Sequence, residues 1–245
     1  MFGRLREDID AVFQNDPAAK SKFEIVFCYP GLHALWLFRI SSFFWKKQWY
    51  FTARFLSHIN RFLTGIEIHP AAQIGRGVFI DHGMGVVIGE TATVGDGCLI
   101  YKGVVLGGTS FEKTKRHPTL GKKVIVGSNA CVLGNISIGD NVRIGSGSVV
   151  VKDVPANATV VGVPGRIIER SKNKDHEVML DHGQLPDPIA EAFRALIKEN
   201  NKLLTRIKKL EESLNIVSND NSRESNTESI IMTTFMKNYH NGEGI

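Results

Sequence analysis

The sequence is poor in cysteine, with only Cys28, Cys98 and Cys131 among 245 residues. This odd number of cysteines, without any C-x-x-C spacing, argues against a disulfide framework and against a zinc ribbon. Few and scattered thiols are typical of proteins in a reducing compartment. We therefore expect a cytoplasmic protein.

The chain also lacks the apolar core of a signal peptide and a long hydrophobic run. Its first eight residues read MFGRLRED, which is not the pattern of a secretion signal. The apolar stretch at residues 32–45 is too short to span a bilayer and contains His33 and Arg39. We expect no membrane association.

No long stripe of positive charge runs along the sequence, although the net charge is +5. A local basic cluster suits a small phosphorylated ligand better than a nucleic-acid backbone, and we expect no nucleic-acid partner. For the lysines taken singly, a solvated charged loop is the alternative. The clustered residues, set against the single acidic Glu112, are Lys113, Lys115, Arg116, Lys122 and Lys123.

What the sequence does contain is a six-residue repeat over residues 66–168. Six residues are too few for a helical repeat but fit one short strand and a tight turn, with the aliphatic side chain pointing inwards. Three such units would close a triangular coil, so a mostly β fold, a parallel β-helix, is predicted without its hand. The aliphatic positions are Ile68, Ile74 and Ile80, then, after a two-residue insertion, Ile88, Val94, Ile100 and Leu106, and finally Leu120, Val126, Val132, Ile138, Ile144 and Val150.

Helical patterns lie on both sides of the repeats. Residues 1–65 have apolar residues at roughly helical spacing and predict an N-terminal α-helical domain, in which Asp16-Pro17 has the form of a helix start. Residues 66–168 form the β-helix domain in this interpretation. Residues 169–245 form a C-terminal extension.

In that extension, apolar residues alternate steps of four and three from Ile189 to Leu214, with Asn200 as the one polar member. This is a heptad pattern and predicts a helix at about 187–214. A helix lying on its own subunit and a coiled coil between subunits both fit, and the strict alternation favours the coiled coil. Residues 215–226, rich in Ser, Asn and charge, predict a disordered linker before a flexible tail.

The insertion in the repeat carries His82, between Asp81 and Gly83. A histidine near neutral pKa can take a proton from a hydroxyl group and return it to a leaving group. Glu67 is the candidate carboxylate that orients it, because it lies fifteen residues upstream, close to one coil length. A turn-capping histidine and a surface glutamate are the alternative; the glycine-flanked insertion favours a general base.

A second polar segment interrupts the repeat between Leu106 and Leu120. Loops on a rigid scaffold are frequent places for substrate contacts. The planar guanidinium of Arg116 can bind a carboxylate through two parallel hydrogen bonds. His117 can donate or accept a hydrogen bond beside it. A solvent loop with incidental charge is the alternative, and a binding role is favoured.

A metal site is a weaker interpretation. His69, His82 and His117 offer three imidazoles, as catalytic zinc prefers, but no pair has the H-x-x-x-H spacing. Acid–base catalysis without a metal is therefore favoured. The glycines match neither a P-loop nor a dinucleotide-binding fingerprint.

Several of these stretches resemble the hexapeptide-repeat acyltransferases and, within them, the serine O-acetyltransferases. The matching segments include residues 29–36, 68–72, 81–83, 87–92, 106–109, 115–118 and 162–166. The resemblance implies a left-handed parallel β-helix in a homotrimer with active sites between neighbouring subunits. It also implies acetyl transfer from acetyl-CoA to the hydroxyl of L-serine, giving O-acetyl-L-serine for cysteine biosynthesis.

The resemblance implies roles residue by residue. His82 is then the general base and Glu67 its orienting carboxylate. The amino acid is held by Asp16, Asp81, Arg116 and His117, and the CoA channel is lined by Gly108, Thr109, Ser128, Arg143 and Ser146. L-Cysteine, an isostere of serine, is implied as a feedback inhibitor, and the terminal Gly244-Ile245 as the contact to O-acetylserine sulfhydrylase.

Some alternatives stay open at this point. The short N-terminal part is compatible with a trimer and with a dimer of trimers. A sugar or other hydroxyl acceptor, a metal-dependent hydratase on the same scaffold, and a catalytically silent scaffold that only binds the sulfhydrylase are the rival functions. Arg116 beside His117 favours an amino-acid acceptor, because a guanidinium binds a carboxylate in a bidentate manner.

Overall fold

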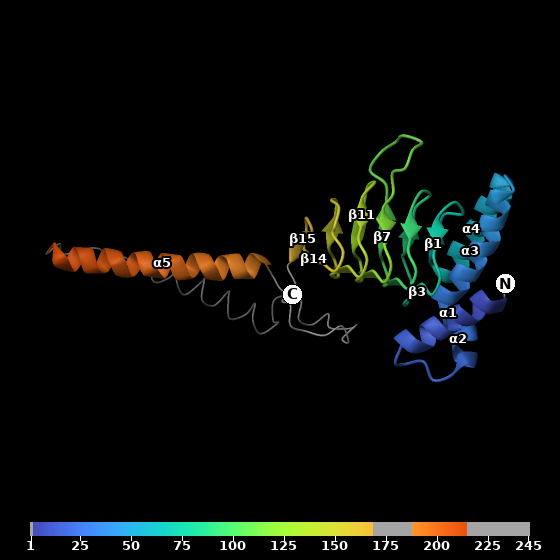
Figure 1. Ribbon diagram of the computed structural model, residues 1–245, viewed down its shortest axis with the longest axis horizontal. Coiled ribbons are helices and arrows are strands. Elements are labelled where there is room, and N and C mark those ends of the chain that lie inside the picture. Colours follow the sequence, from blue (N-terminus) through green and yellow to red (C-terminus); the bar gives the residue numbers. More distant parts are fainter. Residues whose placement is uncertain (1, 169–187, 215–245) are drawn as a thin grey trace. The chain divides into compact units, whose positions relative to one another are not determined.

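Four helices precede the repeats in the computed structural model, which describes residues 2–168 and 188–214 (Figure 1). Helix α2 begins after Ser21, whose hydroxyl accepts a hydrogen bond from the Glu24 backbone N–H (3.1 Å). Helix α4 ends at Gly65, which takes the left-handed conformation (φ 70°) typical of a helix C-terminus. The helices are α1 (Phe2–Asn15), α2 (Lys22–Cys28), α3 (Pro30–Lys46) and α4 (Tyr50–Thr64).

The prediction of a helix start at Asp16-Pro17 was wrong. Asp16 lies in the turn between α1 and α2, and the helix begins only at Lys22. The Asp16 carboxylate instead accepts hydrogen bonds from the Ala18 backbone N–H (2.8 Å) and the Tyr29 hydroxyl (2.6 Å). Aspartate favours turns as well as helix caps because its side chain bonds the backbone two residues further on.

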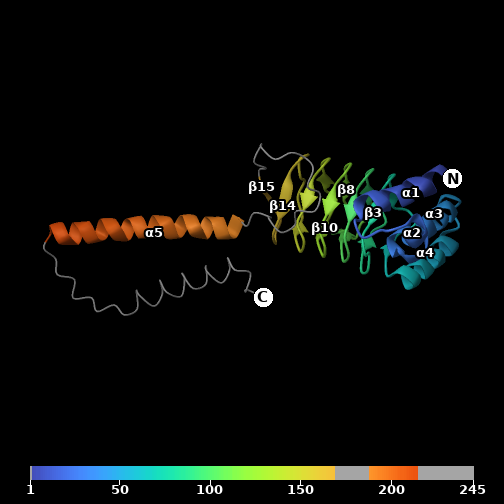
Figure 2. The ribbon, with the colours of Figure 1, turned by 90° about the horizontal axis from the view of Figure 1, so that it is seen from below.

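After α4, short parallel strands form the three faces of a prism (Figures 1 and 2). The first face contains β1 (Glu67–Ile68), β4 (Val87–Ile88), β7 (Val105–Gly107), β10 (Cys131–Leu133) and β13 (Val149–Val150). The second contains β2 (Gln73–Ile74), β5 (Thr93–Val94), β8 (Thr119–Leu120) and β11 (Ser137–Ile138). The third contains β3 (Phe79–Ile80), β6 (Leu99–Ile100), β9 (Ile125–Val126), β12 (Arg143–Ile144), β14 (Thr159–Val161) and the antiparallel β15 (Arg166–Ile168).

The repeated aliphatic positions fill the interior of the prism, as the sequence predicts. On the first face Ile68, Ile88, Leu106, Val132 and Val150 are each at most 2% exposed and stack in register from coil to coil. Burying one such side chain contributes roughly 1.5–3 kcal/mol relative to leaving it in water. The stack therefore holds the coils together and makes the prism a rigid support for the turns and loops at its edges.

The N-terminal helices share this core. Ala34, Leu35 and Phe38 of α3 belong to the same buried cluster as the prism interior. Gly31 lies so close to β3 that a Cβ there would collide with the Ile80 backbone. Both views show α1–α4 gathered around the end of the prism that holds the first coil (Figures 1 and 2). Residues 2–168 thus belong to one compact unit.

The second unit, residues 188–245, begins with helix α5 (Pro188–Ser213). The N-terminal helices, the parallel sheets and this C-terminal helix agree with the predicted fold class at that level. The linker expected at 215–226 and the tail residues Gly244 and Ile245 lie outside the described residues.

No single helix among residues 2–168 and 188–214 has the length and apolarity needed to cross a membrane. The pair α2 and α3 reaches that composition only when taken together, and a bend of 65° separates its two helices.

Candidate active site

His82 lies at the edge where the third face meets the first, in the turn that joins β3 to β4. It takes a left-handed backbone conformation (φ 56°), uncommon for a non-glycine residue, and is exposed. Gly83 follows with φ 71°, and a Cβ there would overlap the Ile66 side chain. The turn therefore requires glycine at 83 and holds the imidazole outside the prism.

Two carboxylates lie beside this turn. Burial raises the pKa of Asp81, and the negative charge of Asp16 raises it further while His82 lowers it. The pKa of Tyr101 is raised by burial and then by Asp81 and Asp16. Asp16 comes from the α1–α2 turn and is held by the Tyr29 hydroxyl. The fold thus brings together two acidic residues that lie 65 positions apart in the sequence, and such a pair suits a cationic amine.

Glu67 lies on β1, and its carboxylate contacts the Arg61 guanidinium of α4 at 3.3 Å. Within residues 2–168, where both side chains are described, no hydrogen bond joins Glu67 to His82. The orienting role of Glu67 stays a prediction.

Arg116 and His117 lie on a different edge, where the first face meets the second. The segment between β7 and β8 projects from the prism there as a long loop (Figure 1). The Arg116 guanidinium contacts the Glu90 carboxylate, and this hydrogen bond lowers the pKa of Glu90. Glu90 thereby fixes the direction of the guanidinium on the returning limb of the loop.

Thr91 ties the same limb to the prism. Its hydroxyl oxygen accepts hydrogen bonds from the backbone N–H groups of Arg116 (3.0 Å) and His117 (3.1 Å). Its backbone carbonyl accepts another from the Lys115 ammonium group (2.5 Å). Thr91 thus contacts three consecutive residues of the loop.

These contacts determine the tautomer of His117, which is only 8% exposed. A threonine hydroxyl has two lone pairs and one hydrogen. Because both lone pairs of Thr91 accept backbone N–H groups, its hydrogen points to His117 Nδ1, at 2.9 Å, which also accepts the Thr91 backbone N–H (3.2 Å). Burial and then Arg116 lower the pKa of His117. The ring is therefore neutral near pH 7 with its hydrogen on Nε2, and it acts as a donor.

His69 lies on the same edge, between β1 and β2, one coil before Thr91 and two coils before His117. Burial, followed by Arg54, lowers its pKa to about 4. Its ring packs edge-on against Trp45, with centroids 4.9 Å apart, and its Nδ1 accepts the Ala71 backbone N–H at 3.1 Å. His69 is therefore neutral in the folded chain at pH 7.

We expect this histidine to make the fold sensitive to acid. Between pH 6.5 and about 4 the unfolded chain binds a proton at His69 that the folded chain does not, so stability falls as the pH is lowered through this window. In His69→Asn the side chain can still accept the Ala71 N–H but does not titrate. The fall in Tm from pH 7 to pH 4.5 should be smaller in the variant by about 2–4 °C; equal falls in both proteins would contradict this.

Sequence reasoning assigned no role to Glu90 or Thr91. The repeat register pairs Thr93 with Thr119 and Val94 with Leu120, which places residues 90 and 91 directly beneath 116 and 117. The loop between β7 and β8 interrupts the six-residue spacing, so the sequence alone does not show which residues of one coil stack on residues 116 and 117. The pairing of β5 with β8 supplies this register.

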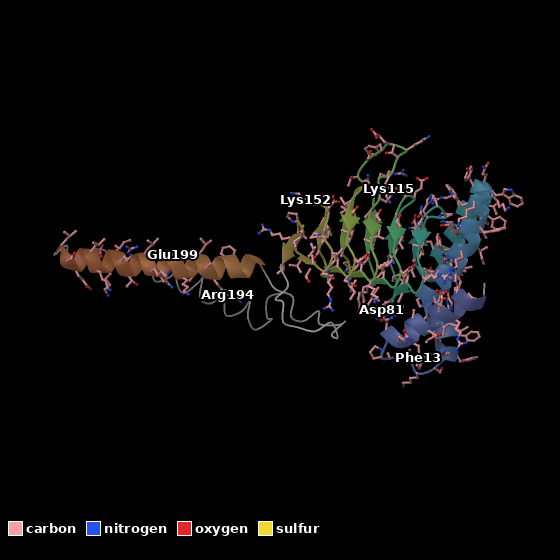
Figure 3. The ribbon with its side chains drawn as sticks, in the orientation of Figure 1. Phe13, Asp81, Lys115, Lys152, Arg194 and Glu199 are labelled. Carbon is pink, nitrogen blue, oxygen red and sulfur yellow. The ribbon has the colours of Figure 1, made fainter. Side chains whose placement is uncertain are left out.

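The candidate residues form two groups on two edges of one chain. Asp16, Asp81 and His82 lie on the edge between the third and first faces, where Ser128 and Ser146 also follow strands β9 and β12. Arg116, His117, Gly108 and Thr109 lie on the loop edge, and Arg143 is in β12. Figure 3 shows the separation, with Asp81 and Lys115 labelled on opposite edges in that view. One chain alone therefore does not bring His82 to Arg116.

No group of three or more His, Cys, Asp or Glu side chains is arranged to hold a metal ion in the part of the chain that the structure describes. His69 and His117 lie on the loop edge and His82 on the other.

Comparison with known proteins gives a consistent result. The family model described as bacterial transferase hexapeptide (six repeats) matches residues 117–152. The chain is 53% identical over 202 residues to a serine acetyltransferase of Bacillus pumilus, covering 82% of this chain and 93% of that protein. It is 53% identical over 214 residues to one of Synechococcus elongatus, covering 87% and 84%. The chain belongs to the serine acetyltransferase family.

Solved structures of this family agree. The serine acetyltransferase of Neisseria gonorrhoeae in complex with serine matches with a TM-score of 0.66 and 40% identity, over 69% of each chain. That of Brucella abortus in complex with coenzyme A matches with a TM-score of 0.67 and 42% identity, over 68% of this chain and 67% of that one.

The family membership confirms the resemblance found in the sequence. The chain is a serine O-acetyltransferase, an acyltransferase that uses acetyl-CoA as co-substrate in cysteine biosynthesis.

Proposed function

We propose that this serine acetyltransferase acts at a site built between neighbouring copies of the chain. The edge with Asp16, Asp81 and His82 of one copy faces the loop edge with Arg116 and His117 of the next. The observation that carries this proposal is the position of the two groups on different edges of a single prism. A cyclic homotrimer of left-handed β-helices brings unlike edges together at each of its contacts, because its interfaces are head-to-tail.

In this site His82 is the general base. It takes the proton of the serine hydroxyl as the hydroxyl oxygen attacks the thioester carbonyl carbon of acetyl-CoA. A tetrahedral intermediate forms, its carbon–sulfur bond breaks, and the CoA thiolate takes the proton back from His82. No covalent acyl-enzyme is needed. The exposed ring of His82, held outside the prism by its left-handed turn, supports this role.

Charged side chains bind both the carboxylate and the ammonium group of serine. The Arg116 guanidinium, fixed by Glu90, binds the carboxylate, while Asp16 and Asp81 of the neighbouring copy bind the ammonium group. The Nε2–H of His117 donates to a serine oxygen, because Thr91 occupies its Nδ1. Glu67 orients His82 once the substrates are bound, in exchange for its contact with Arg61.

The remaining assignments follow from the same proposal. Acetyl-CoA lies along a channel lined by Gly108, Thr109, Ser128, Arg143 and Ser146, and no metal takes part. L-Cysteine competes with serine because it offers the same amine and carboxylate. The helices of residues 1–65 cap the catalytic residues 66–168, and the extension 169–245 binds O-acetylserine sulfhydrylase through Gly244 and Ile245. The enzyme is cytoplasmic. It assembles as a homotrimer or as a dimer of trimers.

One assay tests the acceptor. Thiol release from acetyl-CoA is measured with L-serine, with serine amides and esters that lack the free carboxylate, and with sugars. We expect release only with the free amino acid, because Arg116 has no partner on the other acceptors. A sugar that replaces serine at equal efficiency would instead favour the alternative acceptor on the same scaffold.

We expect Thr91→Val to weaken serine binding selectively. The variant keeps the shape of the side chain but leaves the N–H groups of Arg116 and His117 without an acceptor and lets the His117 ring change tautomer. The kcat/KM for serine should fall about 10- to 100-fold, and the KM for acetyl-CoA should change little.

Thr91→Ser is the matched control, since it retains the hydroxyl and should recover most of the activity. If Thr91→Val and Thr91→Ser lose the same activity, the hydroxyl does not position the loop and the proposed role of His117 as a donor loses its support.

A further inference from the structure

Helix α5 carries an apolar stripe that no other described side chain of its unit covers. Phe193, Leu196, Leu203, Ile207 and Leu210 are between 44% and 66% exposed. A continuous stripe of large apolar side chains on a single helix is an interaction surface. It also leaves the helix without the tertiary packing that stabilises most helices in water.

The stripe has the spacing of a coiled coil. Residues Phe193, Asn200, Ile207 and Leu214 occupy the a positions of successive heptads, and Ile189, Leu196, Leu203 and Leu210 occupy the d positions. This spacing of 3.5 residues keeps the stripe on one side only when the helices wind around each other. The apolar Ile197 and Leu204, at e positions, broaden the face as in helices that contact more than one neighbour.

Asn200 indicates which partner fits this face. In a parallel coil of identical helices in register, each Asn200 lies in the same layer as the Asn200 of its partners, and the amides can bond to each other. In an antiparallel pair, or against an apolar surface, the amide would be buried opposite leucine without a partner. The single polar a position therefore favours identical helices, parallel and in register.

The charges beside the stripe favour the same arrangement. In a parallel coil a g residue faces the e residue of the next heptad on its neighbour. Arg206 is at g and Glu211 is at the following e position, so they form an attractive pair between copies. Glu199, at the preceding g position, is already paired with Lys202 of its own helix at 3.2 Å.

We propose that α5 forms a parallel, in-register coiled coil with the α5 helices of two other copies of the chain. The stripe shares no residue with the proposed active site, and the proposal goes beyond acetyl transfer. It gives the assembly a second contact, located in the C-terminal extension.

Paired cysteine variants of the full chain test this directly. In a Cys28→Ser background, Leu210→Cys places a thiol at a d position and Glu212→Cys places one on the outer f position two residues away. The purified proteins are oxidised with glutathione disulfide and run on non-reducing gels. We expect Leu210→Cys to join up to about two thirds of the chains in pairs, since three thiols in one layer form one disulfide. Glu212→Cys should join few.

Leu210 is chosen because it lies far from the middle of the helix. In an antiparallel pair centred on the helix, two copies of residue 210 would be about 25 Å apart and could not bond. Leu196→Cys and Lys198→Cys repeat the comparison on the N-terminal side of the helix midpoint. Equal cross-linking of the d and f variants, or cross-linking of neither d variant, would overturn the proposal.

Serine-dependent thiol release of the same reduced samples keeps the two proposals apart. Since these residues lie outside the proposed site, all four variants should retain the activity of the parent. An active enzyme without preferential cross-linking at 196 and 210 rejects the coiled coil alone. Preferential cross-linking in an enzyme that does not need His82 rejects the proposed mechanism alone.

Discussion

Serine-dependent thiol release should fall about 100- to 10,000-fold in His82→Asn, the range expected for loss of a general base. Asparagine is the informative substitution because position 82 has φ 56°, a conformation that asparagine tolerates and alanine does not favour. The side chain remains polar and the turn can keep its shape, but the proton acceptor is lost. The measurement is kcat with saturating serine and acetyl-CoA.

An unchanged fold must accompany the loss. The Tm and the oligomeric mass of His82→Asn should equal those of the parent, and serine should still bind, because Arg116, Asp16 and Asp81 are intact. Gly83→Ala is a contrasting variant, since a Cβ there would overlap Ile66 and should lower the Tm. Turnover within a few-fold of the parent in His82→Asn would reject the mechanism.

Two inactive variants should restore each other's activity when co-expressed. His82→Asn removes the base from one edge, and Arg116→Ala removes the carboxylate ligand from the other. If the chain forms the proposed trimer and each site uses His82 of one copy and Arg116 of the next, about three quarters of randomly mixed assemblies contain both variants. Each of these has one intact site in three, so activity should return to about a quarter of that of the parent.

The control is co-expression of His82→Asn with the double variant His82→Asn/Arg116→Ala, which contains no intact His82 and should stay inactive. When the mixed trimers alone are isolated through different tags on the two chains, the recovered activity should rise from about a quarter to about a third of that of the parent. If the mixture of single variants is no more active than its parts, the site lies within one chain and the between-copy arrangement is wrong.

Both experiments depend on the rigidity of the prism. The first face lies between the His82 edge and the loop edge. Its inner side chains are buried and close-packed, so the two edges keep a fixed separation. A small motion of the loop between β7 and β8 cannot carry Arg116 around the prism to His82. A neighbouring copy is the simplest way to complete the site.

The electrostatics of the two edges are complementary in this arrangement. The edge at His82 carries the carboxylates Asp16 and Asp81, whereas the loop edge presents Arg116 and Lys115. A zwitterionic amino acid between them has its ammonium group on the acidic side and its carboxylate on the basic side. This orientation leaves the hydroxyl of serine free to reach the base.

Local patterns predicted local features well, with one failure at a turn. The left-handed φ of His82 and Gly83 occurs where the repeat is interrupted, as the insertion indicates. Asp16, by contrast, was expected to start a helix and instead holds a turn with Ala18 and Tyr29. Aspartate before proline fits both conformations, and only the packing of Tyr29 against it determines which one forms.

The sequence by itself determined the coil interior, because aliphatic residues every six positions have no other way to leave water than to stack as short strands. It also determined the chemical nature of the site residues and the heptad pattern of α5. Only the tertiary structure decided which of these residues meet: Asp16 with Asp81, Thr91 with His117, Glu90 with Arg116. These pairs lie 26–65 positions apart in the sequence, and a periodic sequence does not specify the path of the loop that brings them together.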